Sequence, residues 1–62
     1  MIAENIKSLR MENNLTQNEL ALELNVSLKT ISHWESGYTE PSIMIIKKLK
    51  EFFKVSYEEL LD

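Results

Sequence analysis

Residues 16–37 (TQNELALELNVSLKTISHWESG) constrain the fold more than any other stretch of this chain. Thr16 is followed three positions later by Glu19, which is the spacing of a capping box and predicts the start of a helix. Asn25 then lies only two residues before Ser27, which leaves room for nothing except an abrupt change of direction. We expect Asn25 to adopt a positive φ and Ser27 to cap a second helix. This stretch therefore predicts two short helices joined by a tight turn.

The second helix of this stretch has two different sides. Ile31 and Trp34 lie three positions apart, so both are expected to face the core, and Gly37 is expected to end the helix. The positions that are then directed outward are Leu28, Lys29, Ser32 and His33. Because these residues are not needed for packing, the outward side is where we expect the function to be presented.

Apolar residues before and after this stretch also recur at helical spacing. They form one stripe from residue 2 to about residue 12 and another from residue 43 to about residue 53, which predicts two further amphipathic helices. Ser56 with Glu59 three positions later predicts a short last helix. The residues expected to face the core in the two longer helices are Ile2, Ile6, Leu9, Ile43, Ile46, Leu49 and Phe53. The expected fold is a single all-α domain of five short helices over residues 1–62.

Composition narrows the class of protein. The chain has no Cys and one His, so neither a disulfide framework nor a structural metal site is expected, and no cofactor is predicted. The longest uninterrupted apolar run covers residues 43–46, far short of a membrane span, which favours a soluble, cytoplasmic protein. No nucleophile–base pair or carboxylate dyad can be built around His33 at helical spacing, so an enzyme is not expected.

The spaced residues of this region resemble the helix-turn-helix of the phage repressor and Cro-like (Cro/CI-type, XRE) family. The matching residues are Thr16, Gln17, Glu19, Leu20, Ala21, Val26, Ser27, Thr30, Ile31, Ser32, Trp34, Glu35 and Gly37, followed by Pro41 and Ser42. The similarity extends over about residues 2–61. It implies a five-helix, lambda-repressor-like domain whose third helix enters the major groove of a double-stranded DNA operator, usually as a two-fold dimer. A transcriptional repressor acting as a homodimer is therefore the leading hypothesis.

The resemblance also implies roles for individual residues. Ser27, Leu28, Lys29 and His33 match the positions from which the family reads base edges. Gln17, Thr30, Ser32, Gly37, Tyr38 and Ser42 match positions that contact the DNA backbone. Arg10 and Glu35 match a buried ion pair that joins the first helix to the end of the third. In chemical terms, Lys29 can donate to guanine O6 and N7, and Leu28 can contact a thymine methyl group.

Each of these roles has a purely structural alternative. Gln17 and His33 can be ordinary solvated side chains, and Leu28 can pack against the preceding helix instead of contacting a base. Tyr38 can cover an edge of the core. Arg10 and Glu35 can both be solvated, although an Arg fork and a carboxylate satisfy each other where either one alone would be costly to bury.

The helix expected over residues 43–53 carries more apolar surface than one core stripe requires. Ile45, Lys48 and Phe52 lie at spacings of three and four along one edge, which favours a dimer interface there. The full set of residues assigned to this interface is Ile45, Lys48, Phe52, Tyr57 and Leu61. The alternative is deeper burial of the apolar members within one chain.

The overall charge argues against DNA binding by bulk attraction. The formal net charge is −3 and the pI is about 5.1, whereas neutralising phosphates requires Lys and Arg on the contacting face. A second hypothesis is therefore that the same fold serves as a protein-interaction module, such as an antitoxin or an anti-regulator. Lys29 and His33 favour DNA as the partner, whereas Leu28 favours a protein.

Overall fold

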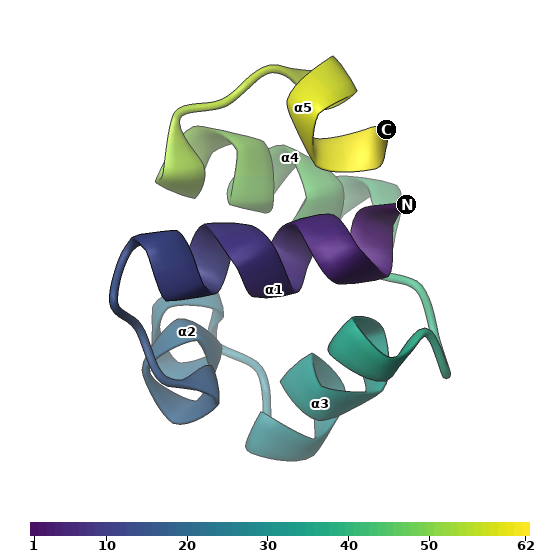
Figure 1. Ribbon diagram of the computed structural model, residues 1–62. Helices are drawn as coiled ribbons and strands as arrows, with labels where there is room; N and C mark the ends of the chain where they lie inside the picture. Colours follow the sequence, from purple (N-terminus) through teal and green to yellow (C-terminus); the bar gives the residue numbers. More distant parts are fainter.

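The computed structural model describes all 62 residues and contains five α-helices and no strand. The helices are α1 (Ile2–Glu12), α2 (Gln17–Leu24), α3 (Leu28–Ser36), α4 (Ile43–Phe53) and α5 (Tyr57–Leu61). Helix α1 crosses the middle of the molecule, with α4 and α5 on one side and α2 and α3 on the other (Figure 1). The chain ends meet, since the Met1 ammonium group donates to the Asp62 carbonyl oxygen over 2.8 Å. The expected five-helix, all-α fold is confirmed.

Local hydrogen bonds account for the turn between α2 and α3. Thr16 Oγ1 accepts the backbone N–H of Glu19 at 3.0 Å, and Glu19 Oε1 accepts that of Thr16 at 2.8 Å, so the capping box is present. Asn25 ends α2 with a φ of 57°, and Ser27 Oγ accepts the N–H of Thr30 at 3.1 Å where α3 begins. The predicted positive φ at Asn25 and both predicted caps are confirmed.

The other helix ends rely on the same kinds of local contact. Ser42 and Ser56 cap α4 and α5, and Ser56 forms a second capping box with Glu59, as the sequence predicts. Helix α3 ends at Gly37 with a φ of 80°, in the left-handed region where glycine carries no penalty. Helix α4 ends in the same conformation at Lys54, where the side-chain Cβ makes it unfavourable.

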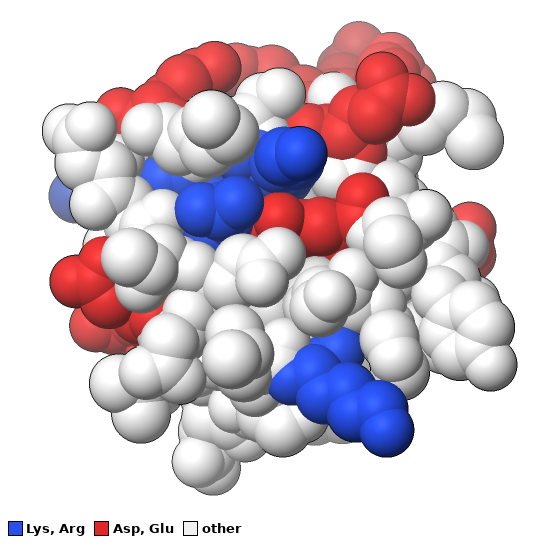
Figure 2. Space-filling view, turned by 60° about the horizontal axis from the view of Figure 1, so that its bottom comes forward, with Lys and Arg blue, Asp and Glu red and all other residues white.

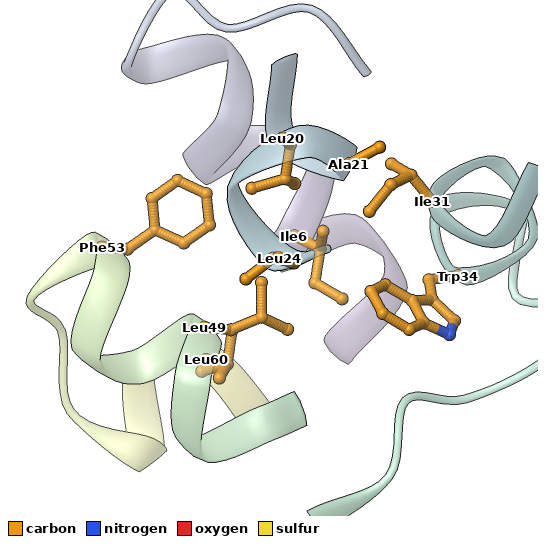
Figure 3. Packing of buried hydrophobic residues seen from close by; sticks show 9 residues of the cluster. All are labelled: Ile6, Leu20, Ala21, Leu24, Ile31, Trp34, Leu49, Phe53 and Leu60. Carbon is orange, nitrogen blue, oxygen red and sulfur yellow. The ribbon is translucent and has the colours of Figure 1, made fainter. Parts of the chain in front are cut away.

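All five helices contribute to one apolar core (Figure 3). Its members are Ile6, Leu20, Ala21, Leu24, Ile31, Trp34, Leu49, Phe53 and Leu60. Ile6 of the central helix α1 is fully buried and belongs to the same cluster as residues from α2, α3, α4 and α5. The angle between α2 and α3 is therefore held by packing against the rest of the molecule as well as by the turn.

One predicted core residue lies on the surface. The expectation that Ile43 faces the core is wrong, because it is 85% exposed. Ile43 is the first residue of α4, and helical side chains lean toward the N-terminus of their helix, so this one projects beyond the core. The core side of α4 instead runs through Ile45, Leu49 and Phe53 at spacings of four, with Ile46 also packed against the core.

Candidate nucleic-acid interface

The outer face of α3 consists of side chains that take no part in the core. Leu28 is 48% exposed. Lys29 and Ser32 are also exposed, whereas His33 is half-buried. Trp34, on the opposite side of the same helix, is buried. Since positions three and four apart share a helix face, the structure brings four of the predicted contact residues to one side of one helix.

The side of the molecule formed by α2 and α3 carries little positive charge. Lys29 is the only Lys or Arg in α2, α3 or the turn between them, whereas α2 holds Glu19 and Glu23. Figure 2, which turns this side toward the viewer, shows large white areas, a few blue groups and several red ones. Contact with an anionic partner at this surface therefore depends mainly on neutral hydrogen-bond donors.

An ion pair joins α1 to the end of α3. Arg10 Nε lies 2.6 Å from Glu35 Oε2, and Arg10 Nη2 lies 3.0 Å from Glu35 Oε1, so the contact is bidentate. Arg10 Nη1 donates to the Leu15 carbonyl oxygen at 2.8 Å. The side chain of Arg10 is only 12% exposed, and that of Glu35 only 4%. The hydrogen bond to Glu35, followed by its Coulombic attraction, raises the pKa of Arg10 against the opposing effect of burial. The guanidinium stays charged, and three of its five N–H groups donate within the domain.

Gln17 extends this pair to a third helix. Its Nε2 donates to Glu35 Oε1 at 3.1 Å, so α1, α2 and α3 all meet at one carboxylate. Gln17 retains a second side-chain N–H and its backbone N–H, which as the first amide of α2 has no partner within the helix. The bond between Gln17 and Glu35 is absent from the sequence-based prediction, because no local pattern links residues 18 positions apart.

The hydroxyl groups at the start of α3 are bonded to each other. Ser27 Oγ lies 2.8 Å from Thr30 Oγ1, in addition to capping the N–H of Thr30. Ser27 is exposed and Thr30 is half-buried. Both hydroxyls therefore lie at the helix N-terminus, where the backbone amides favour a negatively charged ligand.

The loop after α3 uses its backbone amides internally. Gly37 N donates to the Trp34 carbonyl oxygen at 3.2 Å, and Tyr38 N donates to the His33 carbonyl oxygen at 2.9 Å. These two amides are occupied, so the Tyr38 hydroxyl is the donor that remains at this position, and Tyr38 is 76% exposed. Ser42 is exposed and caps α4 through its Oγ.

The residues assigned to a dimer interface do not share one environment. Phe52, Tyr57 and Leu61 are 38%, 46% and 45% exposed, and Lys48 is exposed as well. Ile45, in contrast, is half-buried and packs against the core of its own chain.

Met44 takes the position along this edge that was assigned to Ile45. It is 75% exposed and precedes Lys48 and Phe52 at spacings of four, so the exposed edge of α4 runs through Met44. Lys50 Nζ lies 5.2 Å from the centroid of the Tyr57 ring, which places a cation over the aromatic face between α4 and α5.

Two other kinds of feature are absent from the structure. No group of three or more His, Cys, Asp or Glu side chains comes together in a way that could hold a metal ion. None of the five helices has the length and apolar character needed to cross a membrane.

Comparison with known families identifies the domain. A family model described as helix-turn-helix matches residues 6–60, which is most of the chain. The chain belongs to the helix-turn-helix family. The resemblance inferred from the spaced residues is thus confirmed, and α2 with α3 forms the helix-turn-helix itself.

Relatives of this helix-turn-helix domain include much longer proteins. The HTH-type transcriptional activator BcrR of Enterococcus faecalis is 45% identical over 58 residues, covering 94% of this chain and 28% of BcrR. Antitoxin PezA of Streptococcus pneumoniae is 38% identical over 61 residues, covering 98% of this chain and 39% of PezA. The chain therefore spans well under half the length of either relative.

A solved structure of similar architecture contains DNA. The master regulator for biofilm formation SinR, crystallised in complex with DNA, is 35% identical to this helix-turn-helix domain, and the two superpose with a TM-score of 0.87. The match covers 100% of both chains. The arrangement of all five helices is thus that of SinR.

Proposed function

We propose that this domain binds double-stranded DNA in a sequence-specific manner and regulates transcription, with α3 in the major groove. The observation that carries the proposal is the outer face of α3, where Leu28, Lys29 and Ser32 are exposed while the opposite side of the helix is buried. An α-helix fits the major groove, in which base edges present distinct donors, acceptors and methyl groups. The similarity to SinR, which was crystallised with DNA, supports the same conclusion.

The proposed contacts fall into two groups. Base edges are read by Ser27, Leu28, Lys29 and His33, whereas the DNA backbone is contacted by Gln17, Thr30, Ser32, Tyr38 and Ser42. Gly37 is left out of this set because its only N–H donates to the Trp34 carbonyl oxygen. Lys29 donates to guanine O6 and N7, and Leu28 packs on a thymine methyl group. Gln17 uses its second side-chain N–H for a phosphate while Glu35 holds the other.

We further propose that two copies bind a two-fold operator. A single module of this size buries only about 600–1,000 Å² on DNA, so two half-sites are needed for useful affinity at cellular salt. The half-site centres then lie about 34 Å apart, one turn of the duplex. The dimer interface is assigned to Lys48, Phe52, Tyr57 and Leu61, with Met44 at the exposed edge, whereas Ile45 is half-buried and packs against the core of its own chain.

Selection from random duplex DNA at about 0.1 M salt tests sequence reading directly. We expect enrichment of a palindromic or near-palindromic site. Lys29→Ala should relax the preference at one base pair per half-site, because a bidentate contact to guanine contributes about 1–3 kcal/mol of discrimination. Gln17→Ala is the matched control, since loss of a phosphate contact should weaken all sites alike. Failure to enrich any sequence with the wild-type domain would overturn the proposal.

The dimer is tested separately by sedimentation equilibrium. Phe52→Glu should raise the dimer dissociation constant at least about tenfold, because a charge in an apolar interface is costly to desolvate. Met11→Glu is the control, since Met11 is 58% exposed on α1, outside the proposed interface. A wild-type domain that stays monomeric at high concentration and on its operator contradicts the dimer.

Similarity to Antitoxin PezA supports a second candidate function, a module that binds another protein. The net charge of −3 suits a basic partner protein. An apolar patch on that partner could contact Leu22 and Leu28, which are 74% and 48% exposed. This candidate predicts no enriched DNA sequence and no dependence of partner binding on Lys29, so the selection experiment separates the two.

A further inference from the structure

The end of α3 forms a Schellman motif that brings two aromatic rings together. In this motif the residue after the left-handed glycine donates its N–H to the carbonyl five positions earlier, and the side chains of the same two residues make contact. Gly37 is the left-handed residue, with a φ of 80°. The bond from Tyr38 N to the His33 carbonyl oxygen, at 2.9 Å, is the expected one. The conformation of Gly37 therefore fixes which two side chains meet.

The side chains brought together are those of His33 and Tyr38. Their ring centroids lie 4.8 Å apart, with an angle of 59° between the ring planes, which is within the range of favourable aromatic contacts. His33 is half-buried, whereas Tyr38 is 76% exposed, so the Tyr ring is held by little apart from this contact and its own backbone. The Tyr38 ring thus packs against the imidazole at a tilt, while His33 keeps part of its surface exposed.

We propose that Tyr38 is a positioning residue for base reading, whose ring restricts the imidazole of His33 to one orientation on the outer face of α3. The proposal rests on the proposed DNA binding. A neutral imidazole carries one donor and one acceptor nitrogen, so its reading of a base edge depends on the direction in which the ring points. A side chain already restricted in the free protein loses less conformational entropy on binding.

This role is different from a phosphate contact by the Tyr38 hydroxyl. The ring and the hydroxyl can be separated by two substitutions, because Tyr38→Phe keeps the ring and Tyr38→Ala removes both. Since Tyr38 is largely exposed and lies outside the apolar core, neither change should affect the fold. Thermal melts of both variants verify this point before any binding is measured.

The first measurement requires no DNA. NMR of the free domain should show ring-current shifts at the imidazole protons of His33 and χ1 couplings typical of a single rotamer. Both should persist in Tyr38→Phe, and both should move toward the values of a freely rotating His in Tyr38→Ala. Unchanged imidazole shifts and couplings in Tyr38→Ala would overturn the positioning role, whatever the domain binds.

The second measurement repeats the DNA selection with four proteins: wild type, His33→Ala, Tyr38→Ala and Tyr38→Phe. A good side-chain contact to a base discriminates by about 5- to 150-fold. His33→Ala should reduce discrimination at one base pair of each half-site to about twofold or less. Tyr38→Ala should relax the same base pair and no other, whereas Tyr38→Phe should keep the wild-type preference with lower affinity for all sites. A fifth protein that combines His33→Ala with Tyr38→Ala should be no more relaxed at this base pair than His33→Ala alone.

The outcomes of the selection separate this inference from the proposed function. A uniform loss of affinity in Tyr38→Ala, with every base preference kept, would show that the residue contacts only phosphate and would overturn the inference while DNA reading stands. A wild-type domain that enriches no sequence would overturn DNA reading itself, and with it any role for Tyr38 in specificity. Relaxation at the base pair read by His33 would support both.

Discussion

The Glu35 carboxylate shows how a charge can be buried almost completely in a domain of this size. Arg10 donates to both of its oxygens, and Gln17 adds a further N–H, so the carboxylate loses its water but not its hydrogen bonds. A buried pair with complete partners is close to neutral in its net effect on stability, whereas removal of one partner leaves an uncompensated charge. This asymmetry makes Arg10 the more informative residue to change.

We predict that Arg10→Ala lowers the free energy of unfolding by about 3 kcal/mol, because Glu35 is left buried with only the amide of Gln17 as a partner. Urea denaturation at neutral pH measures this loss. Lys7→Ala is the control, since Lys7 is exposed on the same helix and its removal should cost less than about 0.5 kcal/mol. Equal losses in the two variants would contradict the prediction.

Among the helix ends, those of α2, α3 and α4 are closed by a residue in the left-handed conformation, but the residue types differ. Asn25 and Gly37 suit that conformation, whereas Lys54 adopts it with a φ of 57° in spite of its Cβ. Nothing in the packing of Lys54 offsets this penalty, since its side chain is exposed. A residue that adopts the left-handed conformation more easily than Lys54 should therefore make the domain more stable.

Lys54→Gly should raise the free energy of unfolding by about 0.5–1 kcal/mol, because relief of the left-handed strain exceeds the entropy cost of glycine. For a domain of this size that corresponds to an increase in Tm of about 2–8 °C, measured by calorimetry. Lys47→Gly provides the comparison, since Lys47 lies inside α4 and its replacement should cost about 1 kcal/mol. The prediction fails if both variants melt below the wild type.

At the scale of the whole molecule, the distribution of charge sets the way in which DNA can be bound. The net charge is −3, and α2 and α3 together contribute a single cation, Lys29. Arg10 is committed to Glu35, so it adds little to the field at the surface. Figure 2 shows the corresponding face to be largely uncharged. Neutral donors must then supply most of the phosphate contacts, and few counterions are released.

We therefore predict that operator binding depends only weakly on salt. Because Lys29 is the single cation of α3 and is assigned to a base edge, it neutralises at most one phosphate per half-site, so the plot of log K against log salt concentration should have a slope no steeper than about −2 for the dimer. Fluorescence anisotropy titrations of the selected operator between about 50 and 200 mM salt measure this slope. Lys29→Ala should bring it close to zero. A wild-type slope steeper than about −5 would mean that cations outside α3 contact the phosphates.

Much of the fold and part of the candidate site could be predicted from the sequence. The outward face of α3 followed from the spacing of Ile31 and Trp34, and both are buried in the structure. The pairing of Arg10 with Glu35 came instead from family resemblance, because no local pattern connects residues 25 positions apart. Charge and composition indicated neither the partner of Gln17 nor the ring contact of Tyr38.

The sequence by itself determined where the helices begin and end. Only the tertiary structure decided which side chains of different helices come into contact and which stay exposed. Caps such as Thr16 and Ser27 are encoded locally, because each hydrogen bond joins residues at most three positions apart. The exposure of Ile43 and the bond from Gln17 to Glu35 depend instead on how the helices dock. Docking angles arise from the packing of the whole core, which no single segment of the chain specifies.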